Sequence, residues 1–179
     1  MDSINRQQEE KNHENLQGRE AGLKIKELFE KAKTCFFCTG IQTGEPFIPR
    51  PMTVQKVDES GTCWFLSATD SYKNAQIEKD PMVQILFQGG TYSEFVTLYG
   101  EASITTDKAL IKELWEPIFK TWFTEGEDDP RISVIRFVPE EGYYWDTKSN
   151  QVVAFAKQLI GAVAGKTMDD SIEGKLEKM

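Results

Sequence analysis

The spacing of hydrophobic residues changes period several times along the chain, and each change marks the border of an expected element. From Ala21 to Ala32 the apolar positions recur at helical spacing, which predicts a first helix over residues 19–33. Segments rich in aromatic and β-branched residues then predict strands at 34–41, 47–58, 62–68, 82–88, 93–105, 132–139 and 142–146. Short turns join most of these segments, so neighbouring strands are expected to be antiparallel.

Helical segments interrupt the strands and follow them. Ser71 and its polar neighbours are typical of a helix start and predict a short helix over 71–80. Apolar residues at helical spacing predict a longer helix over 105–123, which Pro117 is expected to kink, and a further helix is predicted over 152–165. Because an antiparallel sheet of six or seven strands must close or stack to hide its edges, the pattern favours a mainly β fold, a small barrel with peripheral helices.

The length of the chain indicates one domain with polar ends. Its 179 residues, of which 39% are hydrophobic, are enough to build one core. Residues 1–17 are expected to be a disordered N-terminal tail, 18–147 a single domain, and 148–179 the last helix and a polar tail. The N-terminus shows no apolar signal segment and no run of residues approaches a membrane span, so we expect a cytoplasmic protein.

The charge balance narrows the choice of partners. With 21 Lys and Arg against 29 Asp and Glu, the formal net charge is −8 at pH 7. No cluster of Lys and Arg stands out, which argues against nucleic acid and anionic membrane surfaces as partners. An anionic ligand would therefore need a local pocket of positive charge.

Metal and nucleophilic chemistry have little support in the sequence. Cys35 and Cys38 form a CxxC pair, a spacing found in redox and zinc sites. The pair lies in an expected strand, where positions i and i+3 face opposite sides, and the only histidine is His13 in the polar tail. We therefore interpret the cysteines as packing residues, expect no metal site, and identify no catalytic acid, base or nucleophile.

Two short motifs point to a bound anion. Pro49 and Pro51 flank Arg50 at the start of the second expected strand, where they stiffen the chain around a guanidinium that suits phosphate or carboxylate. Ser71 and Lys73 lie in the first turn of the next helix, where backbone amides, a hydroxyl and an ammonium together favour an anion. A surface arginine in a kinked edge strand and a solvated lysine are the alternative interpretation.

Several segments together resemble a known family. They are RPM at 50–52, WFLSATDSYK at 64–73, YGEASITTDK at 99–108, LWEPIFKTWFTEGEDDP at 114–130 and YYWD at 143–146. In this combination the chain resembles the general stress protein subgroup of the pyridoxamine 5'-phosphate oxidase-like proteins, which are FMN-binding split β-barrels. The resemblance covers about residues 23–146. Thr124 stands where the signature has proline, so the loop after Trp122 is expected to differ.

The resemblance implies a cofactor and residues that bind it. It implies FMN, or the longer FAD, in two sites at the interface of a homodimer. The residues that match the flavin-binding segments are Arg50, Pro51, Met52, Thr53, Phe65, Leu66, Ser67, Ser71 and Lys73, with Trp115 as a residue that would cover the site. By this resemblance Arg50, Ser71 and Lys73 belong to the phosphate end. Trp115 and Trp122 also lie on an apolar stripe at helical spacing, so a place in the core is an equal alternative for Trp115 and the favoured interpretation for Trp122.

Three functions stay open at this point. The first is an FMN-dependent, oxidoreductase-like general stress protein whose redox chemistry resides in the flavin, with an unknown small-molecule redox partner. The second is a flavin carrier, buffer or sensor without turnover, and the third is a cofactor-free dimer that acts through protein contacts. True pyridoxamine 5'-phosphate oxidase activity is not expected, because the C-terminal AGKTMDDSIEGKLEKM does not look like the basic motif that holds the substrate phosphate in those enzymes.

Overall fold

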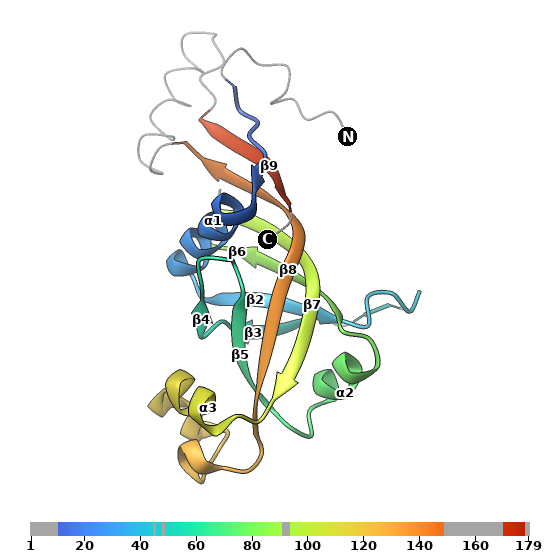
Figure 1. The fold of residues 1–179 in the computed structure, drawn as a ribbon, viewed down its shortest axis with the longest axis vertical. Helices are drawn as coiled ribbons and strands as arrows, with labels where there is room; N and C mark the ends of the chain where they lie inside the picture. Colours follow the sequence, from blue (N-terminus) through green and yellow to red (C-terminus); the bar gives the residue numbers. More distant parts are fainter. Residues whose placement is uncertain (1–10, 45, 48, 91–93, 149–169, 178–179) are drawn as a thin grey trace.

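The centre of the fold is one strongly twisted β-sheet (Figure 1). The structure is a computed structural model and describes residues 11–44, 46–47, 49–90, 94–148 and 170–177. In this part of the chain the strands pair in the order β1-β9-β8-β7-β6-β2-β3, and β5 pairs with both β8 and β4. The strands are β1 Leu16–Gln17, β2 Thr34–Thr39, β3 Arg50–Thr53, β4 Lys56–Val57, β5 Cys63–Ala68, β6 Met82–Gln88, β7 Phe95–Thr105, β8 Ile132–Thr147 and β9 Ser171–Glu177.

One end of the sheet curls into a barrel that stays open along one side. From β7 the antiparallel ladder runs through β6 and β2 to β3. In the other direction it runs through the first half of β8 to β5, from the Ile132–Ala68 pair to the Phe137–Cys63 pair. No ladder joins β3 to β5 among the described strands. This open, antiparallel arrangement is that of a split β-barrel, as the sequence predicts.

The longest strand crosses a border that the sequence pattern predicts. The pattern predicts separate strands over 132–139 and 142–146, but β8 runs without interruption through both ranges. A β-bulge between Tyr99 and Gly100 of β7 lies opposite the expected break. A side chain at Gly100 is excluded, because its Cβ would lie 2.1 Å from the carbonyl oxygen of Val138. The bulge bends the β7–β8 pair without ending it, so β8 serves both ends of the sheet.

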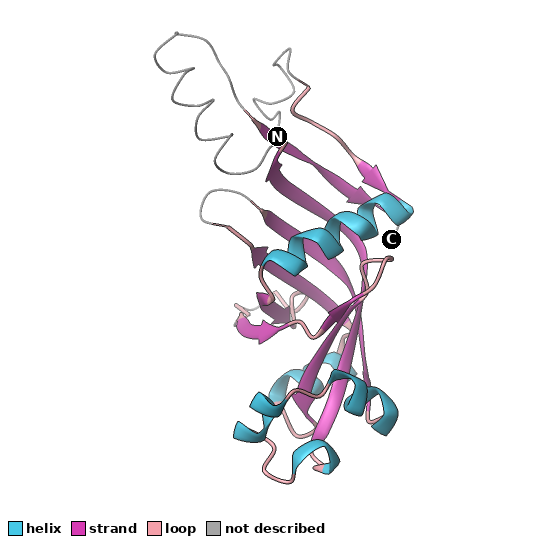
Figure 2. Cartoon of the chain, turned by 90° about the vertical axis from the view of Figure 1, so that its left-hand side faces the viewer, coloured by secondary structure: helices cyan, strands magenta, loops and turns pink. Residues whose placement is uncertain are grey.

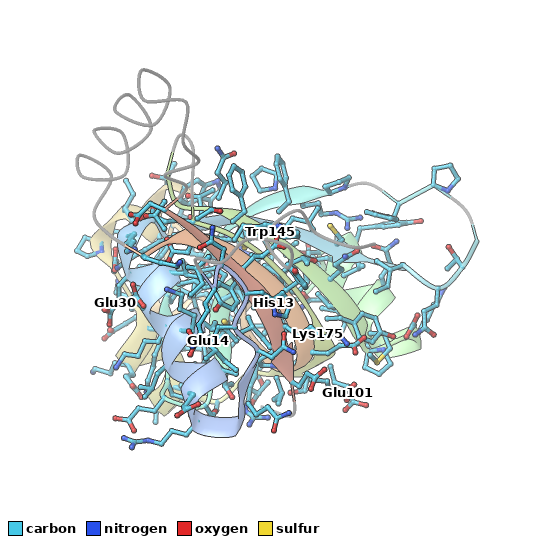
Figure 3. The ribbon with its side chains drawn as sticks, turned by 90° about the horizontal axis from the view of Figure 1, so that it is seen from above. His13, Glu14, Glu30, Glu101, Trp145 and Lys175 are labelled. Carbon is cyan, nitrogen blue, oxygen red and sulfur yellow. The ribbon has the colours of Figure 1, made fainter. Side chains whose placement is uncertain are left out.

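The two ends of the chain add strands that the sequence pattern does not predict. Residues 171–177, expected to be a polar tail, form β9, which pairs with the second half of β8. The last residues of the expected disordered tail 1–17 form β1 parallel to β9, and an isolated β-bridge joins His13 to Glu173. Figure 3 labels His13 in the N-terminal segment and Lys175 in β9. Leu176 is fully buried in the core, so alternate apolar positions anchor this otherwise polar strand. Both segments therefore belong to the sheet, which corrects the prediction of tails.

The structure confirms the predicted helices over 19–33 and 71–80 and corrects the predicted helix over 105–123. They are α1 Gly18–Lys31, α2 Tyr72–Lys79, α3 Lys108–Leu114 and the 3₁₀ helices η2 Pro117–Thr121 and η3 Gly126–Asp128. The predicted helix over 105–123 is not continuous, because α3 ends at Leu114 and the backbone of Trp115 and Glu116 is extended. Proline disfavours helical backbone at the residue before it, so the segment breaks there. The predicted helix over 152–165 lies outside the described residues.

The helices lie at two places along the sheet. Figure 2 shows α1 across one face of the sheet and the shorter helices gathered at the opposite end of the molecule. An ion pair of 2.5 Å between Lys24 and the buried Asp146 ties α1 to β8. None of the described helices is long and apolar enough to cross a membrane.

Two hydrophobic clusters lie on opposite faces of β5. The main cluster packs beneath α1 and contains Phe37 and Phe65, both fully buried, with ring centroids 5.1 Å apart. The second cluster lies beneath α3 and η2 and contains Ile111 and Phe123. Because side chains alternate along a strand, β5 directs Phe65 into the first cluster and Leu66 toward the second. The outer face of β5 therefore meets the segment between α3 and β8.

Candidate functional site

An open cavity of about 490 Å³ lies between the free edge of β3, the outer face of β5, the first turn of α2 and the segment after α3. Its volume lies within the range of roughly 300–1,000 Å³ that is typical of ligand pockets. Six residues of the predicted site line it, namely Pro51, Met52, Thr53, Leu66, Ser67 and Lys73. The sequence prediction missed the others, which are Thr34, Gln55, Ala68, Phe119, Trp122, Phe123 and Arg131.

The charge of this cavity is opposite to that of the chain. The net charge is −8, yet the described residues of the cavity wall include Lys73 and Arg131 and no carboxylate. The Lys73 ammonium is half-buried and makes no hydrogen bond or ion pair with a described residue. Burial, and then the charge of Arg50, lowers the pKa of Lys73. Because a desolvated cation without a partner is unfavourable, a bound anion would stabilise this arrangement.

Arg50 lies beside the cavity and close to Lys73. Its Nη1 donates to Oγ1 of Thr39 at 2.8 Å, and its Nη2 donates to Oε1 of Gln76 at 2.9 Å. The Thr39 hydroxyl also donates to Oε1 of Gln76 at 2.7 Å. This closed network fixes the guanidinium next to α2, where its charge acts on Lys73. The structure therefore brings the two predicted cations together, although Arg50 is not part of the cavity wall.

Ser71 occupies a structural position at the start of α2. It is the N-cap residue, and its Oγ accepts a hydrogen bond from the backbone N–H of Asn74 at 3.3 Å. The hydroxyls of Ser67 and Ser71 both donate to Oδ1 of Asn74, at 2.9 and 3.0 Å. The Asn74 amide donates to Ser133 of β8 at 2.9 Å. This network holds the first turn of α2, and with it Lys73, against β5 and β8, whereas Ser71 itself does not line the cavity.

Two residues of the predicted site lie away from the cavity, Phe65 in the main hydrophobic cluster and Trp115 against the second one. Phe65 is fully buried, because it points to the inner face of β5 while its neighbour Leu66 points to the cavity. Trp115 packs against Phe119 and Phe123, with ring centroids 5.8 and 6.4 Å apart, and lies partly buried against the second cluster. Neither Phe65 nor Trp115 lines this cavity, so the structure does not bring these two residues together with the rest of the predicted site.

The tryptophan at the cavity is the one that the sequence places in the core. Trp122 is 62% exposed and lines the cavity together with Phe119. The apolar stripe over 105–123 is read as one helix face, but the break before Pro117 changes the direction in which the later side chains point. The prediction that Trp122 is a core residue is therefore wrong.

Arg131 is the cationic residue of the cavity that the sequence prediction missed. Its Nε donates to Oδ1 of Asp129 at 3.0 Å and its Nη2 donates to Oδ2 at 2.7 Å. Asp129 is fully buried, and this hydrogen-bonded guanidinium lowers the pKa of its carboxyl group. The signal in the sequence is the DDPR run, where an arginine two residues after an aspartate can form a two-point pair.

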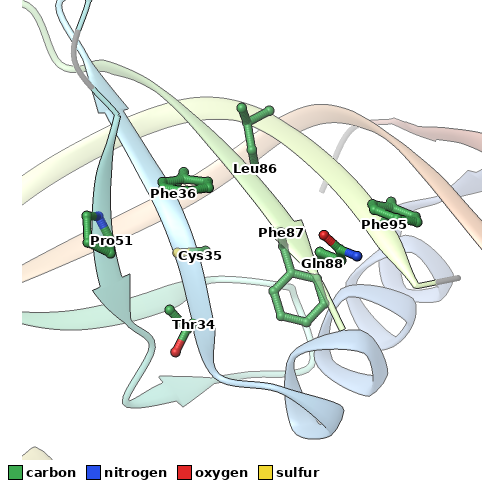
Figure 4. Close-up of a pocket in the computed structure, with 8 residues that line it drawn as sticks. All are labelled: Thr34, Cys35, Phe36, Pro51, Leu86, Phe87, Gln88 and Phe95. Carbon is green, nitrogen blue, oxygen red and sulfur yellow. The ribbon is translucent and has the colours of Figure 1, made fainter. Parts of the chain in front are cut away.

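A second cavity of about 380 Å³ lies on the outer face of the sheet, across β3, β2, β6 and β7 (Figure 4). Its wall contains Phe36, Leu86 and Phe95, and the first two are 52% and 38% exposed. Thr34 and Pro51 line both cavities. An exposed apolar face thus adjoins the positively charged cavity.

The CxxC pair supplies no reactive thiol. Cys35 and Cys38 are free and buried, and burial raises the pKa of both thiols, that of Cys35 to about 12. A thiol with a raised pKa is a weak nucleophile and a weak metal ligand at neutral pH. Within the described ranges, no three potential metal-ligating side chains lie together.

The chain is similar to proteins of one family. A sequence profile described as pyridoxamine 5'-phosphate oxidase like matches residues 20–169. Protein bli-3 of Neurospora crassa is 30% identical over 110 residues, which make up 57% of this chain and 53% of that protein. The chain therefore spans about half the length of this curated relative.

Solved structures share the fold. A general stress protein 26 from Jannaschia sp. CCS1 has a TM-score of 0.73 at 18% identity, over 87% of this chain and 96% of that one. General stress protein 26 from Bacillus anthracis has a TM-score of 0.59 at 24% identity, over 69% and 92%. The general stress FMN/FAD binding protein from Xanthomonas citri has a TM-score of 0.58 at 24% identity, over 68% and 84%. The fold agrees with the profile match, which extends from residue 20 to residue 169, and the chain therefore belongs to the pyridoxamine 5'-phosphate oxidase-like family.

Proposed function

We propose that this protein binds FMN in the cavity between β3, β5 and α2 and acts as an oxidoreductase-like general stress protein. The observation that carries the proposal is Lys73, a half-buried ammonium that has no partner among the described residues, next to Arg50 and in a cavity whose described wall has no carboxylate. FMN has a phosphate that would neutralise both cations. The similar protein from Xanthomonas citri is an FMN/FAD binding protein, which supports a flavin as the ligand.

The remaining cavity wall suits the flavin ring. Pro51, Met52 and Leu66 provide apolar surface, and Gln55 and Ser67 provide polar groups for the edge of the ring. Cations and apolar surface line a single cavity, so one ligand with an anionic end and a flat ring satisfies both. The residues present therefore fit FMN on chemical grounds.

Bound flavin would supply the redox chemistry, and the residues of this chain would bind and orient it. Phe119 and Trp122 of the segment after α3 would shield the ring from water. The described cavity wall holds no histidine and no carboxylate, and its lysine, Lys73, would be engaged by the FMN phosphate. The same observation suits a flavin carrier or sensor, which is the second candidate function.

The visible spectrum of the purified protein tests the proposal. We expect a flavin absorbance band, and mass analysis of the ligand released on denaturation is expected to give FMN. Loss of this band on adding NADH or NADPH would favour an oxidoreductase, and its persistence would favour a carrier or sensor. A colourless protein that takes up no added flavin would contradict both candidates.

We further propose that the protein forms a homodimer through the outer face of β2, β6 and β7. Phe36 and Leu86 leave apolar surface exposed there, and Phe95 lines the same cavity. Because Thr34 and Pro51 border both cavities, a second copy on this face would complete the wall of the flavin site.

Phe36→Glu is expected to convert the dimer to a monomer and to weaken flavin retention. A carboxylate buried without a partner at an interface costs about 3 kcal/mol or more. Light scattering and the flavin content of the eluted protein measure the two effects. Leu23→Glu on α1 is the matched control, since Leu23 is 40% exposed and lines neither cavity. Equal behaviour of the two variants would contradict the proposed interface.

A further inference from the structure

The segment between α3 and β8 brings an aromatic ring and a guanidinium to the same cavity. Trp122 lines the cavity with 62% of its surface exposed, and Nη2 of Arg131 donates to its backbone carbonyl oxygen at 3.4 Å. An indole in this position leaves a large apolar area in contact with water. Neither residue belongs to the pair formed by Lys73 and Arg50, so the proposed phosphate site does not explain them.

The ion pair with Asp129 accounts for only one edge of the Arg131 guanidinium. Asp129 engages Nε and Nη2, whereas Nη1 makes no hydrogen bond with a described residue. The buried carboxylate fixes the plane of the guanidinium, so the Nη1 donors are held in one direction before any ligand binds. The Asp129 carboxylate also offsets the positive charge of Arg131. The guanidinium therefore acts more as an oriented hydrogen-bond donor than as a net positive charge. A fixed donor beside an exposed ring suits a ligand in which a phosphate and a flat ring are joined by a short linker.

We propose that Trp122 and Arg131 form a subsite for an adenosine phosphate group. The purine would stack on the indole, and Nη1 would donate to a phosphate oxygen. The inference rests on the proposed flavin site, because the subsite shares its cavity with Lys73. The group comes either from the AMP half of FAD or from a separate adenine dinucleotide that exchanges electrons with bound flavin. Both sources present the same chemistry to these two side chains.

Calorimetric titration of the full-length protein tests the subsite. Flavin-free protein is titrated with FMN, FAD and ADP, and FMN-loaded protein is titrated with ADP. The variants are Arg131→Gln, Trp122→Leu and Trp122→Phe. Arg19→Gln is the matched control, since Arg19 also donates two hydrogen bonds to a carboxylate, that of Glu59, but does not line the cavity. Arg131→Gln leaves Asp129 buried without its partner, so the exposed Trp122 provides a second variant without this effect on folding.

We expect Arg131→Gln and Trp122→Leu each to weaken binding of the adenosine phosphate group about tenfold. Trp122→Phe keeps a stacking surface and retains most of the affinity, Arg19→Gln changes nothing, and the affinity for FMN is expected to fall less than the affinity for ADP in Arg131→Gln and Trp122→Leu. Tight ADP binding to FMN-loaded protein assigns the subsite to a separate nucleotide. A preference for FAD over FMN that both variants lose assigns it to FAD.

Two results separate failure of the inference from failure of the proposed function. Wild-type protein that binds FMN but shows neither ADP binding nor a variant-sensitive preference for FAD overturns the subsite alone. Wild-type protein that binds no FMN overturns the proposed flavin function. In that case ADP titration of the flavin-free protein still decides the subsite, because binding that both variants weaken supports it and absence of binding overturns it.

Discussion

Lys73→Met is expected to weaken FMN binding roughly 10- to 150-fold while leaving riboflavin binding almost unchanged. A hydrogen bond to a charged group contributes about 1.5–3 kcal/mol, and riboflavin lacks the phosphate that would receive it. Methionine keeps the length of the side chain, so the cavity wall retains its shape. Quenching of flavin fluorescence on titration of flavin-free protein measures both affinities.

A second lysine of the same helix provides the control. Lys79 is exposed in the last turn of α2, and Lys79→Met is expected to leave both affinities unchanged. An equal loss of FMN and riboflavin binding in Lys73→Met would indicate damage to the cavity rather than loss of a phosphate contact. Unchanged FMN binding would contradict the placement of the phosphate beside Lys73.

The same substitution is expected to stabilise the flavin-free protein. Burial, and then the charge of Arg50, lowers the pKa of Lys73 in the folded state, so the charged form is less favourable there than in the unfolded chain. This destabilisation is complete at pH values below the folded pKa and disappears as the pH rises above the ordinary value of 10.5. Methionine removes it at neutral pH, so the flavin-free variant is expected to unfold at a higher Tm than the wild-type protein. Stability gained and affinity lost at one position would show that the ammonium serves the ligand.

The elements that the sequence predicts well are those with strong local signals. The strand over 82–88 and the helix over 71–80 are bounded by proline and by capping residues, and the structure has both within one residue. The motifs around Arg50 and Lys73 were found for the same reason, since a proline on each side and a cation in a first turn are visible without knowing the fold. The order of the strands then brings the two motifs together.

The parts that the sequence does not predict depend on contacts between distant segments. β9 is polar along most of its length and forms because β8 offers it a ladder and because the core accepts Leu176. Position 174 requires glycine because the N-terminal segment passes close to it. A Cβ at this position would lie 1.6 Å from the carbonyl oxygen of Glu14. The directions of the Trp115 and Trp122 side chains depend on where the helix breaks. Because it breaks after Leu114, Trp122 lines the cavity and Trp115 does not. Local periodicity contains none of this information.

Phe65→Ala is expected to lower the free energy of unfolding by about 3–5 kcal/mol, the usual effect of truncating a buried aromatic residue. Phe65 is fully buried, and its ring lies 5.1 Å from that of Phe37. Leu66→Ala, one residue along β5, removes a half-buried side chain and is expected to cost about 1 kcal/mol. Denaturant unfolding of the two flavin-free variants measures the difference.

Flavin binding is expected to respond in the opposite order, because adjacent residues of a strand face opposite sides of the sheet. Leu66 lines the cavity, so its truncation is expected to weaken the binding of riboflavin and of FMN several-fold and to the same extent. Phe65 is not part of the cavity wall. Under conditions where the Phe65→Ala variant stays folded, we therefore expect its affinities for riboflavin and FMN to stay within about twofold of those of the wild-type protein. A stable Phe65→Ala variant that loses flavin would restore Phe65 to the cofactor site and would mean that β5 presents its other face to the ligand. Stability and affinity measured on this one pair of neighbours therefore determine which face of the barrel wall holds the flavin.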